Sequence, residues 1–231
     1  APTITNFNPV TTAIVGEIYT YQVTGVDVDG ENITFSDNST IFDINSSTGL
    51  ISFTPVLSDV GVHSINITAT DGNVNGTDSK IFTLNVYDVI SLNNIQTSVN
   101  DAAYTSLASG ATLAGVHQGD KLEVKVDAKN WLTSNYIDLL RITVTVTDGS
   151  TVIATKNYDL QTLNNGQTIT AELDLGNIPL TTQSKNYNLI INATGQYDAA
   201  APKTAYALWG ANVQVVSQAH QISITSTGVS P

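Results

Sequence analysis

The sequence contains neither cysteine nor methionine. The lack of cysteine excludes disulfide bonds, thiolate nucleophiles and cysteine-ligated zinc sites. A complete cytosolic translation product would normally begin with methionine, so this chain looks processed. Its first residues, Ala1 and Pro2, are compatible with the end that signal-peptide cleavage leaves. We therefore expect a secreted protein, located outside the cell or at the cell surface.

Basic residues are scarce as well. The chain has 8 Lys and Arg against 20 Asp and Glu, for a net charge of -12. Ten of the acids but only Lys80 among the bases lie in residues 1–88, so this part has a net charge of -9 and the rest -3. Without a basic stripe to neutralise phosphates, we expect no nucleic-acid partner. An acidic surface of this kind favours cations.

Long hydrophobic runs are missing too. No apolar stretch approaches the roughly 20 residues that a membrane span needs, so we expect no membrane span. The apolar residues instead alternate with polar ones, as in EIYTYQVTGV, HSINITAT, KIFTLNVYDV, KLEVKVDAK and RITVTVTDGS. A period of two predicts half-buried β-strands, and Asp-Gly or Asn-Gly pairs supply turns between them. The sequence therefore predicts an all-β fold.

The spacing of these strands predicts two tandem domains. Residues 1–88 supply about seven strands, which suits a β-sandwich of immunoglobulin size. Residues 89–231 predict a second immunoglobulin-like β-sandwich with extra C-terminal strands at AYALWGANVQVVS and QISITST. The junction from Tyr87 to Asn94 has neither proline nor glycine, so we expect it to be short and stiff.

Four segments of the first domain carry a more specific pattern. They are GEIYTYQVTGVDVDGENITFS, IFDINSSTGLISFTP, DVGVHSINITATDG and KIFTLNVYDV. Their order resembles the cadherin-like and immunoglobulin-type modules of prokaryotic cell-surface proteins. Residues 115–195 resemble, more loosely, the adhesion-type immunoglobulin-like repeats of archaeal and bacterial surface proteins. These resemblances imply a role at the cell surface.

The stretch TGVDVDGENITFS contains the candidate metal ligands. In cadherin-like modules an Asp-x-Asp at a strand end and the aspartate of A-x-D-G contribute to calcium binding at one pole. The matching residues here are Asp27, Asp29 and Asp71. Glu31 and Asn6 are expected nearby, and their oxygens would add to the six to eight that calcium prefers. The resemblance thus implies a calcium site, with further ligands from water or another subunit.

The same residues have a simpler interpretation. Aspartate and glycine are common in turns because the carboxylate bonds nearby backbone N–H groups and glycine accepts positive φ. On this interpretation, Gly30 and Gly72 form tight turns and the aspartates only cap them. The sequence leaves both interpretations open.

N-x-[ST] triplets are candidate sites for N-linked glycans. Five of the six lie in residues 1–88, where chance placement predicts about two. The acceptors are Asn32, Asn38, Asn45, Asn66, Asn75 and Asn192.

Catalytic and sugar-binding signatures are weak. His63, His117 and His220 are far apart in the sequence, and neither a G-x-S-x-G nor an H-E-x-x-H motif occurs. We therefore expect no enzyme, although folding can still assemble a carboxylate pair. Trp131 and Trp209 lie in apolar surroundings, so we expect core packing rather than platforms for sugars.

These observations favour a non-catalytic structural subunit, more consistent with an archaeal than a bacterial source. Unpaired strand edges allow strand addition between subunits, so we expect a homopolymer in an extracellular filament or surface layer. PTITNFNPV near the N-terminus and QISITST near the C-terminus are candidate donor strands. The alternative is an adhesin or carbohydrate-binding module of a larger secreted protein, with surface glycans as partners.

Overall fold

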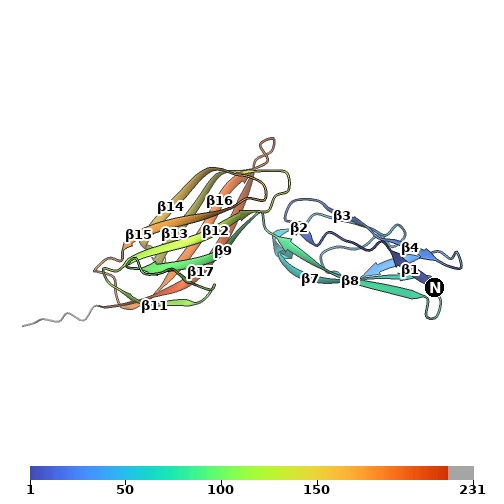
Figure 1. The fold of residues 1–231 in the computed structure, drawn as a ribbon, viewed down its shortest axis with the longest axis horizontal. Coiled ribbons are helices and arrows are strands. Elements are labelled where there is room, and N and C mark those ends of the chain that lie inside the picture. Colours follow the sequence, from blue (N-terminus) through green and yellow to red (C-terminus); the bar gives the residue numbers. More distant parts are fainter. Residues whose placement is uncertain (218–231) are drawn as a thin grey trace, which may run out of the picture.

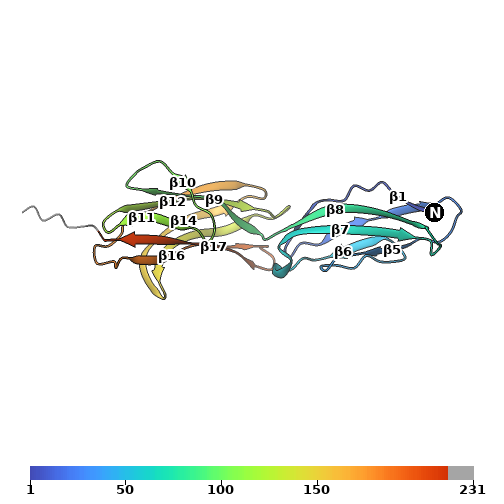
Figure 2. The same cartoon turned by 90° about the horizontal axis from the view of Figure 1, so that it is seen from below.

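A computed structural model describes residues 1–217, and these form an elongated, almost entirely β molecule with two lobes (Figure 1). The N-terminal lobe contains β1 to β8 and the C-terminal lobe contains β9 to β17. Each of the sheets formed by these residues belongs to one lobe. The first residue and the end of β17 lie at opposite ends of the molecule (Figure 2). The predicted all-β fold is confirmed.

The N-terminal lobe is a β-sandwich. Its sheet β2-β8-β7-β5 packs on the pairs β1-β4 and β3-β6. Alternate residues of β7, namely Ile65, Ile67 and Ala69, are buried in the core, as a period of two requires. The elements are β1 (Pro2–Thr5), β2 (Thr12–Ile14), β3 (Tyr19–Gln22), β4 (Thr24–Asp27), β5 (Thr34–Asp37), β6 (Leu50–Phe53), the short 3-10 helix η1 (Leu57–Asp59), β7 (Gly61–Thr70) and β8 (Thr77–Tyr87).

The N-terminal segment belongs to this sandwich. β1 pairs with β4 in antiparallel fashion, and β2 pairs with β8 in parallel. Ile4 of β1 is buried, and its backbone N–H donates to Asp78 Oδ2 at 2.8 Å. PTITNFNPV therefore pairs within its own lobe in this structure, and its use as a donor strand stays a prediction. The other expected donor, residues 221–227, lies outside the described residues.

The C-terminal lobe is a larger sandwich of the sheets β10-β9-β12-β15 and β11-β17-β16-β13-β14. Along β12, Leu122, Val124 and Val126 are fully buried while the lysines and acids between them face outward. The strands are β9 (Ile90–Val99), β10 (Thr105–Ser106), β11 (Thr112–His117), β12 (Lys121–Asn130), β13 (Ile137–Asp148), β14 (Thr151–Leu163), β15 (Thr168–Asn177), β16 (Lys185–Tyr197) and β17 (Lys203–Val216).

The two lobes meet at a short junction between β8 and β9. Val89 and Ile90 are buried in the core of the C-terminal lobe, and Ile14 of β2 joins that core. The N–H of Trp131 donates to the carbonyl of Val89 at 3.0 Å. Each lobe thus has its own hydrophobic core, and the chain crosses between them in two buried residues. The domain boundary between residues 88 and 89 stays a prediction.

Candidate metal centre

The acidic residues singled out in the sequence lie at the far end of the N-terminal lobe, beside Ala1. Asp27 is the last residue of β4, and Asp71 follows β7 directly. One carboxylate oxygen of each residue caps its own loop, because Asp27 Oδ1 accepts from Asp29 N–H and Asp71 Oδ1 accepts from Asn73 N–H, both at 2.8 Å. The second oxygen of each carboxylate remains available for other contacts.

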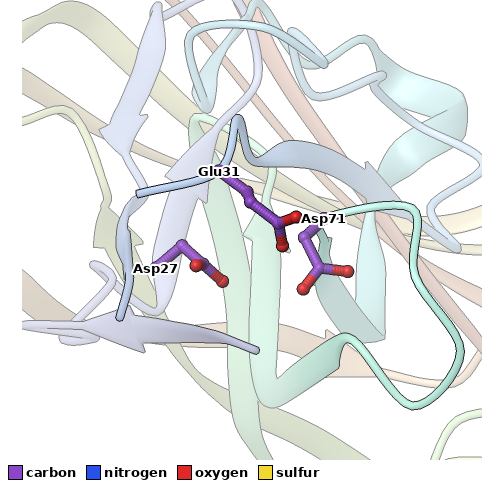
Figure 3. Close-up of side chains that lie close together, drawn as sticks. All are labelled: Asp27, Glu31 and Asp71. Carbon is purple, nitrogen blue, oxygen red and sulfur yellow. The ribbon is translucent and has the colours of Figure 1, made fainter. Parts of the chain in front are cut away.

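Three carboxylates converge at this pole. Oxygens of Asp27, Glu31 and Asp71 lie within 4.8 Å of one another (Figure 3). Asn73 Nδ2 donates to Glu31 Oε2 at 2.8 Å and so ties the β4–β5 loop to the β7–β8 loop. Sequence reasoning did not identify Asn73, because nothing in its local pattern distinguishes a bridging amide from an ordinary turn residue.

Two of these three side chains are covered, whereas Glu31 is exposed. The side chains of Asp27 and Asp71 are 0% and 2% exposed. Among the described residues, Asp27 Oδ2 has no hydrogen-bond partner. The nitrogen of Ala1 lies 3.3 Å from that oxygen and 3.8 Å from Asp71 Oδ2, so a positive group sits where these two carboxylates meet. Buried carboxylates need such compensation, because an isolated buried charge is strongly unfavourable.

The pKa of Asp27 shows which state the site favours. Burial of the carboxyl opposes ionisation, but hydrogen bonds from the Asp29 and Glu31 backbone and from the Ala1 amino group outweigh it, so the pKa is lowered. Asp27 is therefore a carboxylate at neutral pH. A covered, ionised oxygen that already attracts the Ala1 ammonium fits a hard cation such as calcium.

The loop after β7 has room for the Asp71 carboxylate because residue 76 is a glycine. A Cβ atom on Gly76 would overlap the carboxylate of Asp71, whereas one on Gly72 would meet nothing within 4 Å. Gly76 therefore fits the loop around the acidic side chain. This requirement comes from a contact five residues apart, which the sequence pattern does not reveal.

Two expected ligands lie elsewhere. Asp29 is 71% exposed and is not part of the converging group, although its Oδ2 lies 3.5 Å from the Ala1 nitrogen. Asn6 lies beyond the inner end of β1, where its carbonyl accepts from the Tyr21 hydroxyl at 3.4 Å. Its expected place at the pole is wrong, because β1 runs away from the pole. The turn interpretation holds in part, since Gly30 and Gly72 have φ of 79° and 83°.

The candidate glycan acceptors differ in accessibility. Asn66 faces outward between buried neighbours, as expected, but it is half-buried and its Oδ1 is covered. The Oδ1 of Asn38 accepts from the backbone N–H of Asn66 at 2.7 Å, so this amide substitutes for a strand partner. Asn192 is half-buried on the central strand β16. The exposed acceptors are Asn32, Asn38, Asn45 and Asn75.

The two tryptophans are half-buried and pack at the edge of the C-terminal core. Tyr87 stacks on one face of Trp131, and Lys129 Nζ lies 3.3 Å from the ring centroid. Stacking and the lysine together cover both faces of this indole, so no face remains for a sugar ring. The expectation of core packing is therefore met only in part, because neither tryptophan is fully buried.

The described histidines make structural contacts. His63 Nε2 lies 2.7 Å from the carbonyl of Asp59, and His117 Nδ1 lies 3.3 Å from Asp120 Oδ2. Asp120 also accepts from the His117 backbone N–H, which makes this pair a turn contact. His220 lies outside the described residues. Residues 1–217 contain no helix with the length and hydropathy of a membrane span.

Comparisons with known proteins add the following. No family model matches the chain, and no curated protein matches it. Among solved structures, human protocadherin-24 EC1-2 is similar at 14% identity and a TM-score of 0.33, covering 94% of this chain and 99% of that chain. The N-terminal Ig1-2 module of Drosophila receptor protein tyrosine phosphatase DLAR is similar at 12% identity and a TM-score of 0.31, covering 93% and 98%.

Fibronectin(III)-like modules and an enzyme also occur among these neighbours. The enzyme is an endo-fucoidan hydrolase of glycoside hydrolase family 107, at 14% identity and a TM-score of 0.32. The match covers 94% of this chain but only 29% of the hydrolase. The neighbours thus include cadherin and immunoglobulin modules, the two kinds that the sequence resembles.

Proposed function

We propose that the chain is a non-catalytic structural module of an extracellular filament or surface layer, which binds calcium at its N-terminal pole and self-assembles by strand complementation. One observation carries the calcium part of this proposal. The covered Asp27 Oδ2 has no partner within residues 1–217 apart from the Ala1 nitrogen at 3.3 Å, and it faces two other carboxylates. Three carboxylates beside the single amino group of Ala1 leave an excess of negative charge, which a divalent cation would neutralise.

Asp27, Glu31 and Asp71 would hold the ion. Their donor set consists of oxygen only, which suits calcium and magnesium and excludes metals that prefer sulfur or imidazole. These residues come from the end of β4 and from the two neighbouring loops. A cation shared among them would fix both loops and stiffen the pole. Because three side chains do not fill a shell of six to eight oxygens, water or a neighbouring subunit would supply the rest.

Glycans form a second part of the proposal. Asn32 follows Glu31 directly, and Asn75 precedes Gly76 in the loop that carries Asp71. Both acceptors are exposed. N-linked glycans at these positions would surround the acidic pole without covering the buried oxygens. Among the six triplets, Asn32 and Asn75 are therefore the two that we propose as used together with the calcium site.

A binding module is the second candidate function. A cleft of about 600 Å³ lies between the lobes, with Ile18 on one side and Lys129 and Thr133 on the other. This volume falls in the range of small-molecule sites. Of its two aromatic residues, Trp131 has both faces covered and Tyr19 is buried, so a sugar would be held mainly by polar groups. Glycan-array binding that is lost on Lys129→Ala would favour this function over the first.

Thermal unfolding in calcium and in chelator tests the metal site. A ligand at 100 times its dissociation constant stabilises the folded state by about 2.7 kcal/mol, which raises the melting temperature of the N-terminal lobe by several degrees. Asp71→Asn should abolish the rise, and Asp43→Asn, an exposed acid outside the site, should keep it. An unchanged midpoint at millimolar calcium contradicts the site. Electron microscopy of the purified chain in calcium tests self-assembly.

A further inference from the structure

The last strand of the structure has two halves with different neighbours. β17 pairs with β16 along almost its whole length, from Lys203 to Val215. On its other side, β11 pairs with β17 only from Asn212 onward. The first half, Lys203–Trp209, therefore has no backbone-paired strand on its other side among the described residues. We call this half the open edge.

The backbone of the open edge presents unpaired groups. The carbonyl of Gly210 accepts from Gly110 N–H at 2.8 Å, so Gly210 directs its backbone away from β16. In an antiparallel pair, every second residue points the same way. Thr204, Tyr206 and Leu208 consequently direct their N–H and C=O groups outward, and residues 1–217 offer them no backbone partner.

Side chains make this edge a favourable template for another strand. Tyr206 is 45% exposed and Leu208 is 63% exposed on the outer face of the sheet. Ala207 and Trp209 point to the inner side and remain half-buried at the border of the core. Residues 204–209 include neither a charge nor a proline. Long apolar edges without such residues pair readily with other chains.

The opposite edge of the same sheet is protected. There β14 pairs only with β13, and its Lys156 lies across from the buried Val144. Lys156 is therefore on the inner side of the sheet, where an added strand would cover its charge. An inward-pointing lysine on an edge strand is a known barrier to strand addition. The sheet thus blocks addition at β14 and leaves it open at β17.

We infer that the open edge accepts residues 221–227 of a second copy as an added strand, an inference that rests on the proposed self-assembly. The segment QISITST has seven residues, like the open edge, and it is uncharged. Its alternation places Ile222 and Ile224 on one face. That face would cover Ala207 and Trp209, and the threonine and serine hydroxyls would lie on the outer face.

The position of β11 favours a second copy over the same chain. Val216 ends β17 at the far end of the molecule, whereas the open edge lies toward the junction (Figure 1). β11 occupies the edge between the two, over a length of six residues or about 20 Å. A segment returning to its own open edge would first have to pass around β11. A neighbouring copy meets no such obstacle.

Such a contact has a definite geometry. The donor segment follows the far end of one copy, and the acceptor edge lies near the middle of the next. Because the two surfaces differ, the contact is heterologous and generates an open chain of subunits rather than a closed dimer. Each subunit would donate once and accept once.

Two variants of the full chain separate the donor from the acceptor. Tyr206→Pro removes an outward N–H and leaves the ladder with β16 intact, because proline is tolerated on edge strands where its nitrogen faces solvent. Ile222→Asp with Ile224→Asp charges the donor. Light scattering after gel filtration in calcium should give polymers for the unchanged chain and monomers for each variant. An equimolar mixture of the two variants should give a complex of about twice the 24.4 kDa chain mass.

A matched pair of surface variants serves as a control for misfolding. Leu208→Lys and Asn157→Lys place the same charge in one cross-strand row, at the open and the protected edge respectively. We expect Leu208→Lys to reduce polymer formation at least tenfold and Asn157→Lys to leave it unchanged, with similar melting temperatures.

The possible results separate this inference from the proposed function. Polymers that persist in Tyr206→Pro and Leu208→Lys overturn the inference and leave the proposed self-assembly standing. An equimolar mixture that remains monomeric overturns the inference as well, and so do dimers of the isoleucine variant alone, which would indicate pairing of two open edges. A monomeric unchanged chain at high concentration in calcium overturns both.

Discussion

The indole of Trp131 lies parallel to the phenol ring of Tyr87, with ring centroids 3.8 Å apart and an interplanar angle of 5°. Tyr87 is the last residue of β8 and Trp131 follows β12, so this stack joins one lobe to the other. Trp131 Nε1 also donates to Ser91 Oγ at 2.9 Å. Tyr87 and Trp131 both pack against the core that holds the buried Val89 and Ile90, so the stack is part of the junction between the lobes.

The stack should contribute measurably to stability. Aromatic pairs contribute about 0.5–1.5 kcal/mol beyond the area that they bury. A double-mutant cycle of Tyr87→Ala and Trp131→Ala, followed by urea unfolding, should give a coupling energy in that range. Tyr136→Ala combined with Trp131→Ala is the control, because Tyr136 is an exposed residue outside the stack, and it should give no coupling. Additive effects of Tyr87 and Trp131 would contradict the role of the stack.

Asp88 should make the junction sensitive to pH. Burial raises the pKa of this carboxyl above 3.8, against a hydrogen bond from Val89 N–H that lowers it. A raised pKa in the folded state favours the protonated form. The contribution of protonated Asp88 to the free energy of unfolding is therefore fully present below pH 3.8. It is lost as the pH rises through the folded-state pKa. Asp88→Asn should remove this loss and be at least as stable as the unchanged chain at pH 7.

Urea midpoints between pH 3 and pH 7 check the Asp88 prediction. The difference between the Asn variant and the unchanged chain should grow with pH across this range. An Asn variant that becomes less stable than the unchanged chain as the pH rises would show that the carboxylate stabilises the junction instead.

Asp78 should act in the opposite direction. The hydrogen bond from Ile4 N–H and the nearby Lys80 lower its pKa, against partial burial. Its contribution to stability is present above the unfolded pKa of about 4 and is lost as the pH falls through the folded-state pKa. Asp78→Ala should cost about 1–2 kcal/mol at pH 7, because it leaves the N–H of a buried residue unpaired. The cost should shrink toward pH 3, whereas the exposed Thr77→Ala should have little effect at any pH.

The loop around Asp71 offers a test of the metal site that replaces none of the acidic residues. Gly76→Ala puts a methyl group into the space of the Asp71 carboxylate and should abolish stabilisation by calcium. Gly72→Ala, in the same loop, meets no atom but strains a backbone with φ of 83°. It should cost about 1 kcal/mol and keep the response to calcium. Equal calcium responses in both variants would contradict the assignment of Asp71 as a ligand.

The strands could be predicted from the sequence because their signal is local. Ile65, Ile67 and Ala69 are buried with the period of two that the sequence displays. The meeting of Asp27 and Asp71 came from a resemblance, since 43 intervening residues separate them and no local pattern relates them. Asp29 fits the same motif, but β4 ends at Asp27, so Asp29 lies in the turn that follows and its side chain is 71% exposed.

The junction could not be predicted. The stacking of Tyr87 on Trp131 depends on how two lobes are oriented, and the sequence near Trp131 shows only apolar neighbours. The open edge was equally hidden, because alternation identifies β17 as a strand without showing that β11 covers only part of it. Partners across a sheet are set by topology, which periodicity does not encode.

The parallel pairing of β2 with β8 gives the N-terminal lobe a mechanical property. A pulling force between the two ends of the molecule enters this lobe through β1 and leaves it through β8, so it drags β2 and β8 in opposite directions along their length. The bonds from Asn85 N–H to Thr11 C=O and from Val15 N–H to Tyr87 C=O are then loaded in shear. Bonds in shear must rupture together, whereas bonds that are unzipped rupture one at a time. The lobe is therefore built to bear tension along its axis.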